Sequence, residues 1–168
     1  MSKLIRPQAL PLSVLEAQYY VDQFNATYGD ILDRGDYDAW VELFTEDCLY
    51  KVIPRENHDA GLPLATMALE SRGMLKDRAY GITTTLFHAP YYQRHVIGVA
   101  QILNDNGSEI RATANYSVFR TKPGSVSEIY NVGRYLDLFL REGAGLKLKE
   151  RVCVFDSEMI LNSMIYPI

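Results

Sequence analysis

The sequence predicts an α+β fold in which N-terminal helices cover one side of a curved antiparallel sheet. Apolar residues recur every three or four positions in the first half of the chain and at every second position in the second half. The turns between the alternating segments are too short to hold crossover helices, which favours an antiparallel meander. The 168 residues contain no internal repeat or linker, so we expect one domain over residues 1–168, with residues 1–12 as an extended N-terminal arm.

The first helix is expected to begin at Ser13, because Ser13 and Glu16 have the spacing of a capping box. One apolar stripe then continues for about twenty residues, as in a helix buried on one face. Its members are Val14, Ala17, Val21, Phe24, Tyr28 and Ile31. Gly35 is expected to end this helix, and Asp36 to cap a short second helix that carries Trp40, Leu43 and Phe44 inward.

The middle of the chain predicts one strand, one loop and one further helix. Residues 48–53 are expected to form the first strand, which Pro54 ends. Residues 55–63 are polar and rich in turn formers, so we expect a loop. A third helix is expected over residues 64–78, with apolar contacts from Met67, Met74 and Leu75.

Four strands are expected in the second half, separated by turns that contain Asn, Gly or Pro. They span residues 94–103, 110–118, 130–140 and 146–154. On the last strand Lys147, Lys149 and Arg151 share one face, which we expect to be a solvated edge.

Composition and motifs exclude several kinds of function. The formal net charge is −4 and no basic run offsets it, so we expect no nucleic-acid partner. No apolar run is long enough to span a membrane, and no secretory signal is expected. Cys48 and Cys153 lack metal-binding spacing and are expected to be reduced thiols, which indicates a cytoplasmic protein. Phosphate-binding loops and nucleophile turns are absent from the sequence.

The three histidines are the remaining candidates for chemistry. His58 beside Asp59 could form a general base or a metal ligand, but a loop histidine more often is solvated or holds a turn. His88 is expected to close a turn before Pro90. His95 follows Arg94 at the start of a strand, so one of the two should face the interior and the other the solvent or a partner.

Several segments, taken in order, closely resemble the small, or β, subunit of Rieske-type aromatic-ring-hydroxylating oxygenases. The similarity extends from about residue 18 to the end, and it is strongest to members that act on aromatic carboxylates, salicylate 5-hydroxylase first and terephthalate dioxygenase second. The matching segments are Asn57–Leu62, Met74–Arg78, Tyr91–His95, Lys149–Ser157 and the ending Asp156–Ile168.

This resemblance implies a scytalone-dehydratase-like, or nuclear-transport-factor-2-like, cone and a structural subunit without a catalytic site. It also implies an α-subunit partner that holds a Rieske [2Fe–2S] cluster and a mononuclear Fe(II). Three copies of each subunit would form a hetero-hexamer around a β trimer, and ferredoxin and reductase would act through the α subunit. For Tyr91, Arg94 and His95 the resemblance implies a structural or interface role.

The ligand chemistry of the chain agrees with that expectation. A Rieske cluster takes two Cys and two His ligands, each Cys close to a His, and neither cysteine here has a histidine nearby. The mononuclear iron takes two His and a carboxylate, which three scattered histidines would supply only by chance of folding.

An alternative function remains open from the sequence. A cone of this kind could be a stand-alone dehydratase or isomerase, or a small-ligand-binding protein, with His95, Tyr116 and Asp137 lining a pocket. A cone filled by its own side chains would argue against this alternative.

Overall fold

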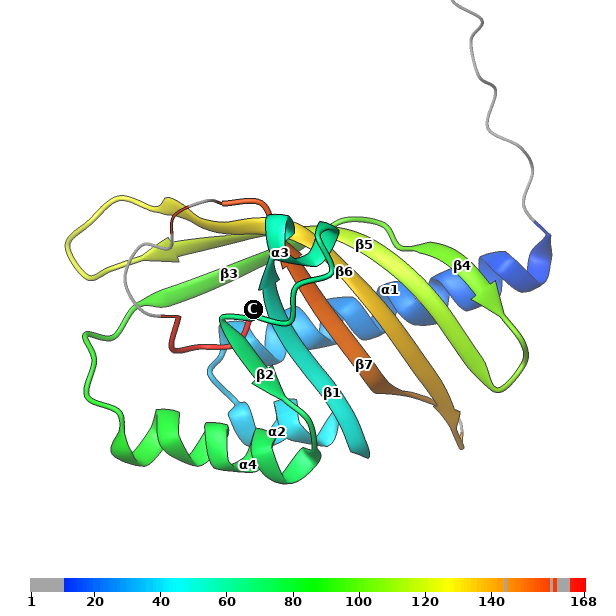
Figure 1. Cartoon of the computed structure of the whole chain (residues 1–168), viewed down its shortest axis with the longest axis horizontal. Helices are drawn as coiled ribbons and strands as arrows, with labels where there is room; N and C mark the ends of the chain where they lie inside the picture. The colour runs from blue at the N-terminus through cyan, green and yellow to red at the C-terminus, as the bar shows by residue number, and fades with distance from the viewer. Residues whose placement is uncertain (1–10, 144, 158, 160–163) are drawn as a thin grey trace, which may run out of the picture.

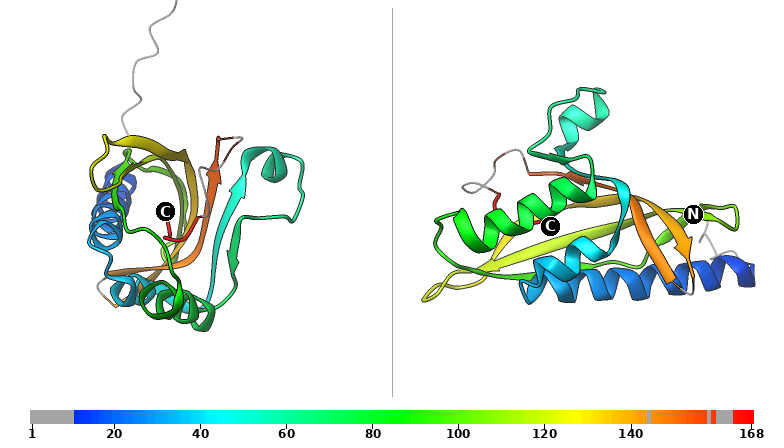
Figure 2. Two further views of the ribbon diagram at one scale, coloured as in Figure 1. Left: turned by 90° about the vertical axis from the view of Figure 1, so that its left-hand side faces the viewer. Right: turned by 90° about the horizontal axis from the view of Figure 1, so that it is seen from below.

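A computed structural model describes residues 11–143, 145–157, 159 and 164–168 of the chain. A strongly curved seven-stranded sheet forms a cone, open on one side, with helices packed along its concave side (Figure 1). Seen end-on, the sheet curls around the interior, and the C-terminal segment runs into that interior (Figure 2). The fold is therefore the α+β cone that the sequence predicts.

Helix α1 (Leu12–Asp33) lies against the open edge of the sheet and buries the predicted stripe, including Ala17 and Val21. It begins one residue before Ser13, so the predicted capping box is wrong. The carbonyl of Pro11 accepts the N–H groups of the first turn, and no side chain caps the helix, because Ser13 is already inside it. Residues 1–10 of the predicted arm lie outside the described residues.

The end of α1 and the start of the next helix follow the prediction, but that helix ends at Glu42, before Leu43 and Phe44, which were expected on it. Gly35 has a positive φ of 71°, and Asp36 Oδ1 accepts the N–H of Ala39 at 3.1 Å at the start of α2 (Tyr37–Glu42). Trp40 is fully buried. Strand β1 (Phe44–Pro54) begins before Cys48, and it ends at Pro54 as predicted.

Two predictions for the middle of the chain are wrong. Residues 55–63 are not all loop, because a short helix α3 (Arg55–Asp59) stands there. Residues 64–78 form two elements, β2 (Met67–Leu69) and α4 (Arg72–Tyr80), followed by the π-helical turn η1 (Gly81–Thr85). Pairing of β2 with β1 keeps the backbone extended until Ser71, whose hydroxyl caps α4. Met67 and Leu75 are buried, whereas Met74 is 40% exposed.

The second half forms most of the sheet, in the strand order β2-β1-β7-β6-β5-β3, with β4 also paired to β5. Its strands are β3 (Tyr92–Ile97), β4 (Gln101–Asp105), β5 (Glu109–Thr121), β6 (Glu128–Glu142) and β7 (Gly145–Phe155). The strand predicted over residues 94–103 is split into β3 and β4, because the N–H of Ala100 leaves the sheet to bind Asp22 Oδ1 at 2.8 Å. Strand β1 extends the sheet by pairing parallel to β7, so the sheet is not purely antiparallel.

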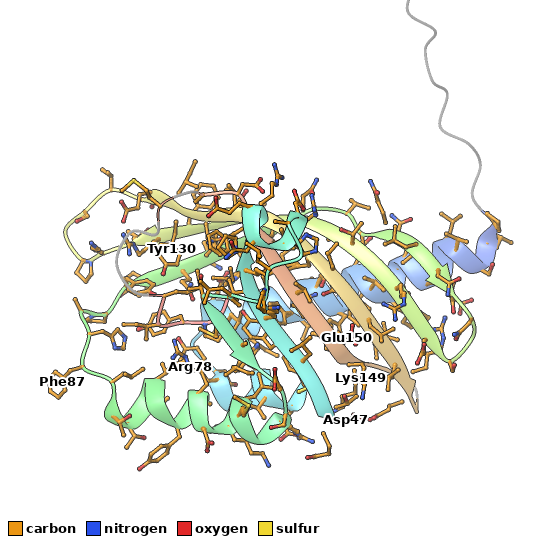
Figure 3. The ribbon with its side chains drawn as sticks, in the orientation of Figure 1. Asp47, Arg78, Phe87, Tyr130, Lys149 and Glu150 are labelled. Carbon is orange, nitrogen blue, oxygen red and sulfur yellow. The ribbon has the colours of Figure 1, made fainter. Side chains whose placement is uncertain are left out.

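A bulge in β7 corrects the predicted basic face. Leu138 on β6 pairs with Glu150, but Phe139 pairs with Leu148, so β7 carries one extra residue there. Leu148 and Arg151 both face the interior as a result, although they are three residues apart. Arg151 is fully buried, and only the two lysines lie toward the outside, where Lys149 binds Asp47 (Figure 3).

Candidate functional site

A buried ion pair lies at the centre of the cone. Asp137 on β6 and Arg151 on β7 are paired in register, and both side chains are almost completely buried. Arg151 donates from Nε to Asp137 Oδ1 at 2.9 Å and from Nη2 to Oδ2 at 2.8 Å. The same Nη2 donates to Asn25 Oδ1 of α1 at 2.6 Å, which ties the helix to the sheet. Burial raises the pKa of the Asp137 carboxyl above its ordinary value, and the Arg151 charge opposes that rise.

Aromatic rings enclose this pair on both sides. The guanidinium of Arg151 lies 4.1 Å from the ring centre of Tyr28 and 4.2 Å from that of Tyr135. Tyr116 stacks on Tyr135 at 4.3 Å and donates from its hydroxyl to Asn131 Oδ1 at 2.8 Å. Burial raises the pKa of all three tyrosines well above the ordinary value, so their hydroxyl groups stay neutral near pH 7.

The C-terminal segment enters the cone beside these rings. The hydroxyls of Tyr28 and Tyr50 donate to the Ile168 carbonyl at 2.8 and 3.0 Å, and the Ile168 N–H donates to the Tyr50 oxygen at 2.9 Å. Arg78 of α4 holds the same segment through the carbonyls of Met164 and Ile165, at 2.8 and 2.5 Å. Ile168 is fully buried, so the chain itself fills this part of the interior.

Alternation predicts that one of Arg94 and His95 faces the interior, and in the structure it is His95, while Arg94 faces the solvent. The His95 side chain is fully buried on β3, and its Nδ1 lies 2.7 Å from Asp33 Oδ1 of α1. The backbone N–H of His95 donates to the same carboxylate at 3.0 Å. Arg94 contacts Asp33 from outside at 3.2 Å, with 72% of its side chain exposed. Gly29 permits this close packing, since a Cβ there would lie 3.3 Å from the His95 Cβ.

The alternative function expected His95, Tyr116 and Asp137 to line one pocket. In the structure each of them has a separate partner. These partners are Asp33, Asn131 and Arg151, respectively. Four polar atoms nearby have no hydrogen-bond partner among the described residues: Asn25 Nδ2, His95 Nε2, Tyr135 Oη and Arg151 Nη1. Buried polar atoms of this kind are usually satisfied by water or by a ligand. Sequence reasoning missed Asn25, Tyr28 and Arg151 as members of this cluster, because only the packing of α1 on a bulged β7 joins them.

The other histidines lie nearer the surface. His58 Nδ1 is 3.0 Å from Asp59 Oδ1, and this hydrogen bond lowers the pKa of the Asp59 carboxyl. Both side chains are partly exposed on α3, and Arg134 approaches Asp59 at 3.6 Å. His88 binds the Leu86 carbonyl through Nδ1 at 3.3 Å, and its Nε2 lies 2.6 Å from the Tyr166 hydroxyl.

Tyr91 and the two cysteines pack against neighbouring side chains. Tyr91 packs on the rings of Tyr166 and Tyr130, at 4.5 and 5.9 Å between centres. Both cysteines are buried, and burial raises the pKa of Cys48 to about 11 and that of Cys153 to about 12. In the part of the chain that the structure describes, no three His, Cys, Asp or Glu side chains are grouped to hold a metal ion. The described helices include none that is long and apolar enough to cross a membrane.

A groove of about 540 Å³ lies between α1 and β3. The exposed Arg94 lies in its wall, together with three carboxylates of α1, which belong to Asp22, Asp30 and Asp33. Asp22 and Asp33 already accept backbone N–H groups of the strand side, which leaves this groove acidic but largely committed to holding the helix in place.

Comparison with known proteins gives consistent matches over most of the chain. A family model described as the ring hydroxylating beta subunit matches residues 29–162. The anthranilate 1,2-dioxygenase small subunit of Burkholderia cepacia is 31% identical over 82% of this chain and 85% of its own length. The terephthalate 1,2-dioxygenase terminal oxygenase component subunit beta 2 of Comamonas sp is 30% identical over 86% of this chain and 94% of its own length.

Solved structures agree with these sequence matches. A crystal structure from Novosphingobium aromaticivorans, ascribed to the beta subunit of an aromatic-ring-hydroxylating dioxygenase, superimposes with a TM-score of 0.85 and 39% identity. The match covers 93% of this chain and 99% of that one. A structure ascribed to scytalone dehydratase from the same organism has a TM-score of 0.68 at 18% identity, covers 92% of this chain and 94% of its own, and shares the fold alone.

Proposed function

Because this chain belongs to the family of small, or β, subunits of aromatic-ring-hydroxylating oxygenases, we propose that it organises the large subunits of such an enzyme and holds no catalytic centre itself. The enzyme complex as a whole is an oxidoreductase. The large, or α, subunit is the partner that a small subunit of this family implies.

The observation that carries the non-catalytic role is the filled interior of the cone. Arg151 and Asp137 satisfy each other at its centre, and Ile168 occupies the space beside Tyr28 and Tyr50. A catalytic acid or base in this fold would need a space for substrate next to a free titrating group. His95 is held by Asp33 through Nδ1 while its Nε2 has no partner among the described residues, so the proposed non-catalytic role rests on the filled interior and not on this contact.

The metal centres are assigned to the large subunit. It would hold the Rieske [2Fe–2S] cluster and the mononuclear Fe(II), and ferredoxin and reductase would deliver electrons to it. We propose three copies of each subunit, with the small subunits associated as a trimer, in the cytoplasm. A closed ring of this kind needs two different contact surfaces on each copy.

The substrate is proposed to be an aromatic carboxylate, with a salicylate-like compound as the first candidate. Two relatives at 30% identity or more are named for anthranilate and terephthalate, which both carry a ring carboxylate. That shared chemistry supports the substrate class.

Tyr91, Arg94 and His95 divide between two roles in this proposal. Arg94 presents most of its guanidinium to the outside and could bridge carboxylates or carbonyl groups of a partner. His95 has a buried side chain and Tyr91 is half-buried against Tyr166, and we propose that they hold β3 and the preceding loop in position.

Co-expression of this chain with a large subunit of the same enzyme family tests the proposal. The intact mass of the purified assembly should fit six chains, with iron bound only when the large chain is present. Stoichiometric iron on the isolated small chain, or oxygenase turnover by it alone, would contradict the proposal.

A second candidate function rests on the four unpartnered polar atoms around Arg151 and Tyr135. Two of the four atoms belong to Asn25 and His95, which line the groove between α1 and β3, so a small polar ligand in that groove would reach them. Thermal-shift measurements with salicylate, benzoate and phenol would show saturable stabilisation of the isolated chain, and the absence of any shift would remove this candidate.

A further inference from the structure

The groove between α1 and β3 has two buried polar residues in its floor. Asn25 is 2% exposed and the side chain of His95 is fully buried, yet both residues line the groove. Each has one polar atom without a hydrogen-bond partner among the described residues, Nδ2 in Asn25 and Nε2 in His95. One turn of α1 separates Asn25 from Gly29, and His95 packs on Gly29, so the two atoms belong to the same stretch of the groove.

The contacts that these two side chains already make fix which of the two atoms donates. Asn25 Oδ1 accepts a hydrogen bond from Arg151 Nη2 at 2.6 Å, so the amide is oriented with Nδ2 as a donor. His95 Nδ1 lies 2.7 Å from Asp33 Oδ1, and a ring nitrogen must carry a proton to bind a carboxylate. In the neutral ring Nε2 therefore carries no proton and accepts. One donor and one acceptor suit a hydroxyl group, because a hydroxyl both accepts and donates.

The walls of the groove combine apolar surface with negative charge. Three carboxylates stand against one guanidinium, that of Arg94, which is already paired with Asp33 at 3.2 Å. Asp30 is exposed, and its described ion pair is with the exposed Arg34 at 3.3 Å. These charges disfavour an anionic ligand. The rest of the lining is apolar or lacks a side chain, and it consists of Ala26, Gly29, Val96, Ile97, Gly98 and Val99.

We infer that this groove binds a small neutral compound with a hydroxyl group on an apolar body, and that it discriminates against carboxylates. The hydroxyl accepts from Asn25 Nδ2 and donates to His95 Nε2, while the apolar body lies along the apolar walls. A volume of about 540 Å³ is sufficient for a single-ring compound. The inference rests on the second candidate function and adds to it the chemical class of the ligand.

Three single-ring probes of similar size test the chemical class: phenol, anisole and benzoate. Their dissociation constants for the full chain are measured by NMR titration at neutral pH. Phenol should bind at least about fivefold more tightly than anisole, because the methyl ether has no proton to donate to His95. It should also bind at least about fivefold more tightly than benzoate, whose charge meets the carboxylates. Asp30→Asn should narrow the difference between phenol and benzoate about twofold or more, because it removes one of these charges.

Two variants of α1 locate the site. Ala26 is exposed and belongs to the lining of the groove, whereas Gln23 is exposed on the same helix and does not. Ala26→Phe fills the groove and should weaken phenol binding about tenfold or more, while Gln23→Phe should stay within about twofold of the wild type. The side-chain nitrogen NMR signal of His95 Nε2 should move with phenol in Gln23→Phe but not in Ala26→Phe. Equal melting temperatures of the two variants would show that both remain folded.

The outcomes separate this inference from the function on which it rests. Anisole or benzoate binding as tightly as phenol, or wild-type phenol affinity in Ala26→Phe, would overturn the inference and leave the second candidate function standing. If none of the three probes binds the wild-type chain, the second candidate function fails and the inference fails with it. The organising role of the chain is tested separately, by the co-expression experiment.

Discussion

Asp33 receives three groups at once, and the three differ in exposure. The N–H and Nδ1 of His95 are buried, whereas Arg94 approaches the same carboxylate from the solvent. Removing a buried acceptor is costly for stability, because its donors are left without a water or protein partner. Removing the exposed member of an ion pair costs little, because solvent replaces the lost contact. The sequence predicts that one of the two strand residues faces inward and the other outward, but neither which one nor the helix residue that meets them.

Asp33→Ala should therefore lower the free energy of unfolding by about 2 to 4 kcal/mol, because two buried donors of His95 lose their acceptor. Arg94→Ala should lower it by less than about 1 kcal/mol. Urea unfolding of the two variants measures the difference. Equal losses would mean that the exposed ion pair, rather than the His95 contacts, stabilises the junction of α1 and β3.

The Arg151–Asp137 pair is the other residue-scale feature with a large expected effect. Arg151→Met leaves the Asp137 carboxylate buried without its counter-charge and should cost about 3 to 5 kcal/mol of stability. The double variant Arg151→Met with Asp137→Leu removes both charges and should recover most of that loss. A double variant as unstable as the single one, in the same urea experiment, would show that the hydrogen bond to Asn25 matters more than the charge balance.

At the scale of elements, the close approach of the paired strands β6 and β7 depends on one glycine. A Cβ at Gly133 would overlap the Val154 carbonyl oxygen and lie 2.8 Å from the Phe155 Cα, both of them backbone atoms that cannot move aside. Gly73 in α4 is the opposite case, since a Cβ there would meet only Ser71 Oγ at 3.7 Å. The sequence alone gives no reason to treat the two glycines differently.

Gly133→Ala should lower the free energy of unfolding by about 3 kcal/mol or more, because the two strands must separate to admit the methyl group. Gly73→Ala should raise it by about 0.5 to 1 kcal/mol, since alanine favours the helix and restricts the unfolded chain. Thermal unfolding of the matched pair checks both signs. A tolerated Gly133→Ala would show that the strands are not in close contact at this point.

At the scale of the whole molecule, the interior holds many groups whose ionisation burial opposes. The thiols of Cys48 and Cys153 have pKa values raised from 9.0 to about 11 and about 12, and the interior tyrosines are shifted in the same direction. Well below pH 9 these groups are neutral in both the folded and the unfolded chain. Above it the unfolded chain releases protons first, so folding loses stability as the pH rises toward the folded pKa values.

The free energy of unfolding should thus fall by at least about 1 kcal/mol between pH 8 and about pH 10.5. At pH 8 only about one thousandth of the Cys48 thiol is ionised, so neither cysteine should react quickly with a thiol reagent until urea unfolds the chain. Urea titrations at the two pH values and a thiol assay test this together. Constant stability across that range, or a fast native thiol, would contradict the buried environment of these side chains.

The sequence by itself determined the elements whose pattern is local. The stripe of α1, the Asp36 cap and the inward position of Trp40 follow from periodicity and turn chemistry, and so do the hairpins β5–β6 and β6–β7. Family membership was also evident, because it rests on several ordered segments rather than on any contact. The prediction of helices and strands from the sequence was less reliable over residues 55–80, where pairing of β2 with β1 overrides the helical preference of the chain.

Tertiary structure alone decided what lies inside the cone. The bulge in β7 reverses which side chains face inward, so Arg151 is buried where simple alternation places it in solvent. Parallel pairing of β1 with β7 and the entry of Ile168 beside Tyr50 join parts of the chain that are far apart in sequence. One inserted residue shifts a period-two pattern without leaving a local signal, and long-range contacts leave none, which is why the ion-pair cluster could not be derived from the residues alone.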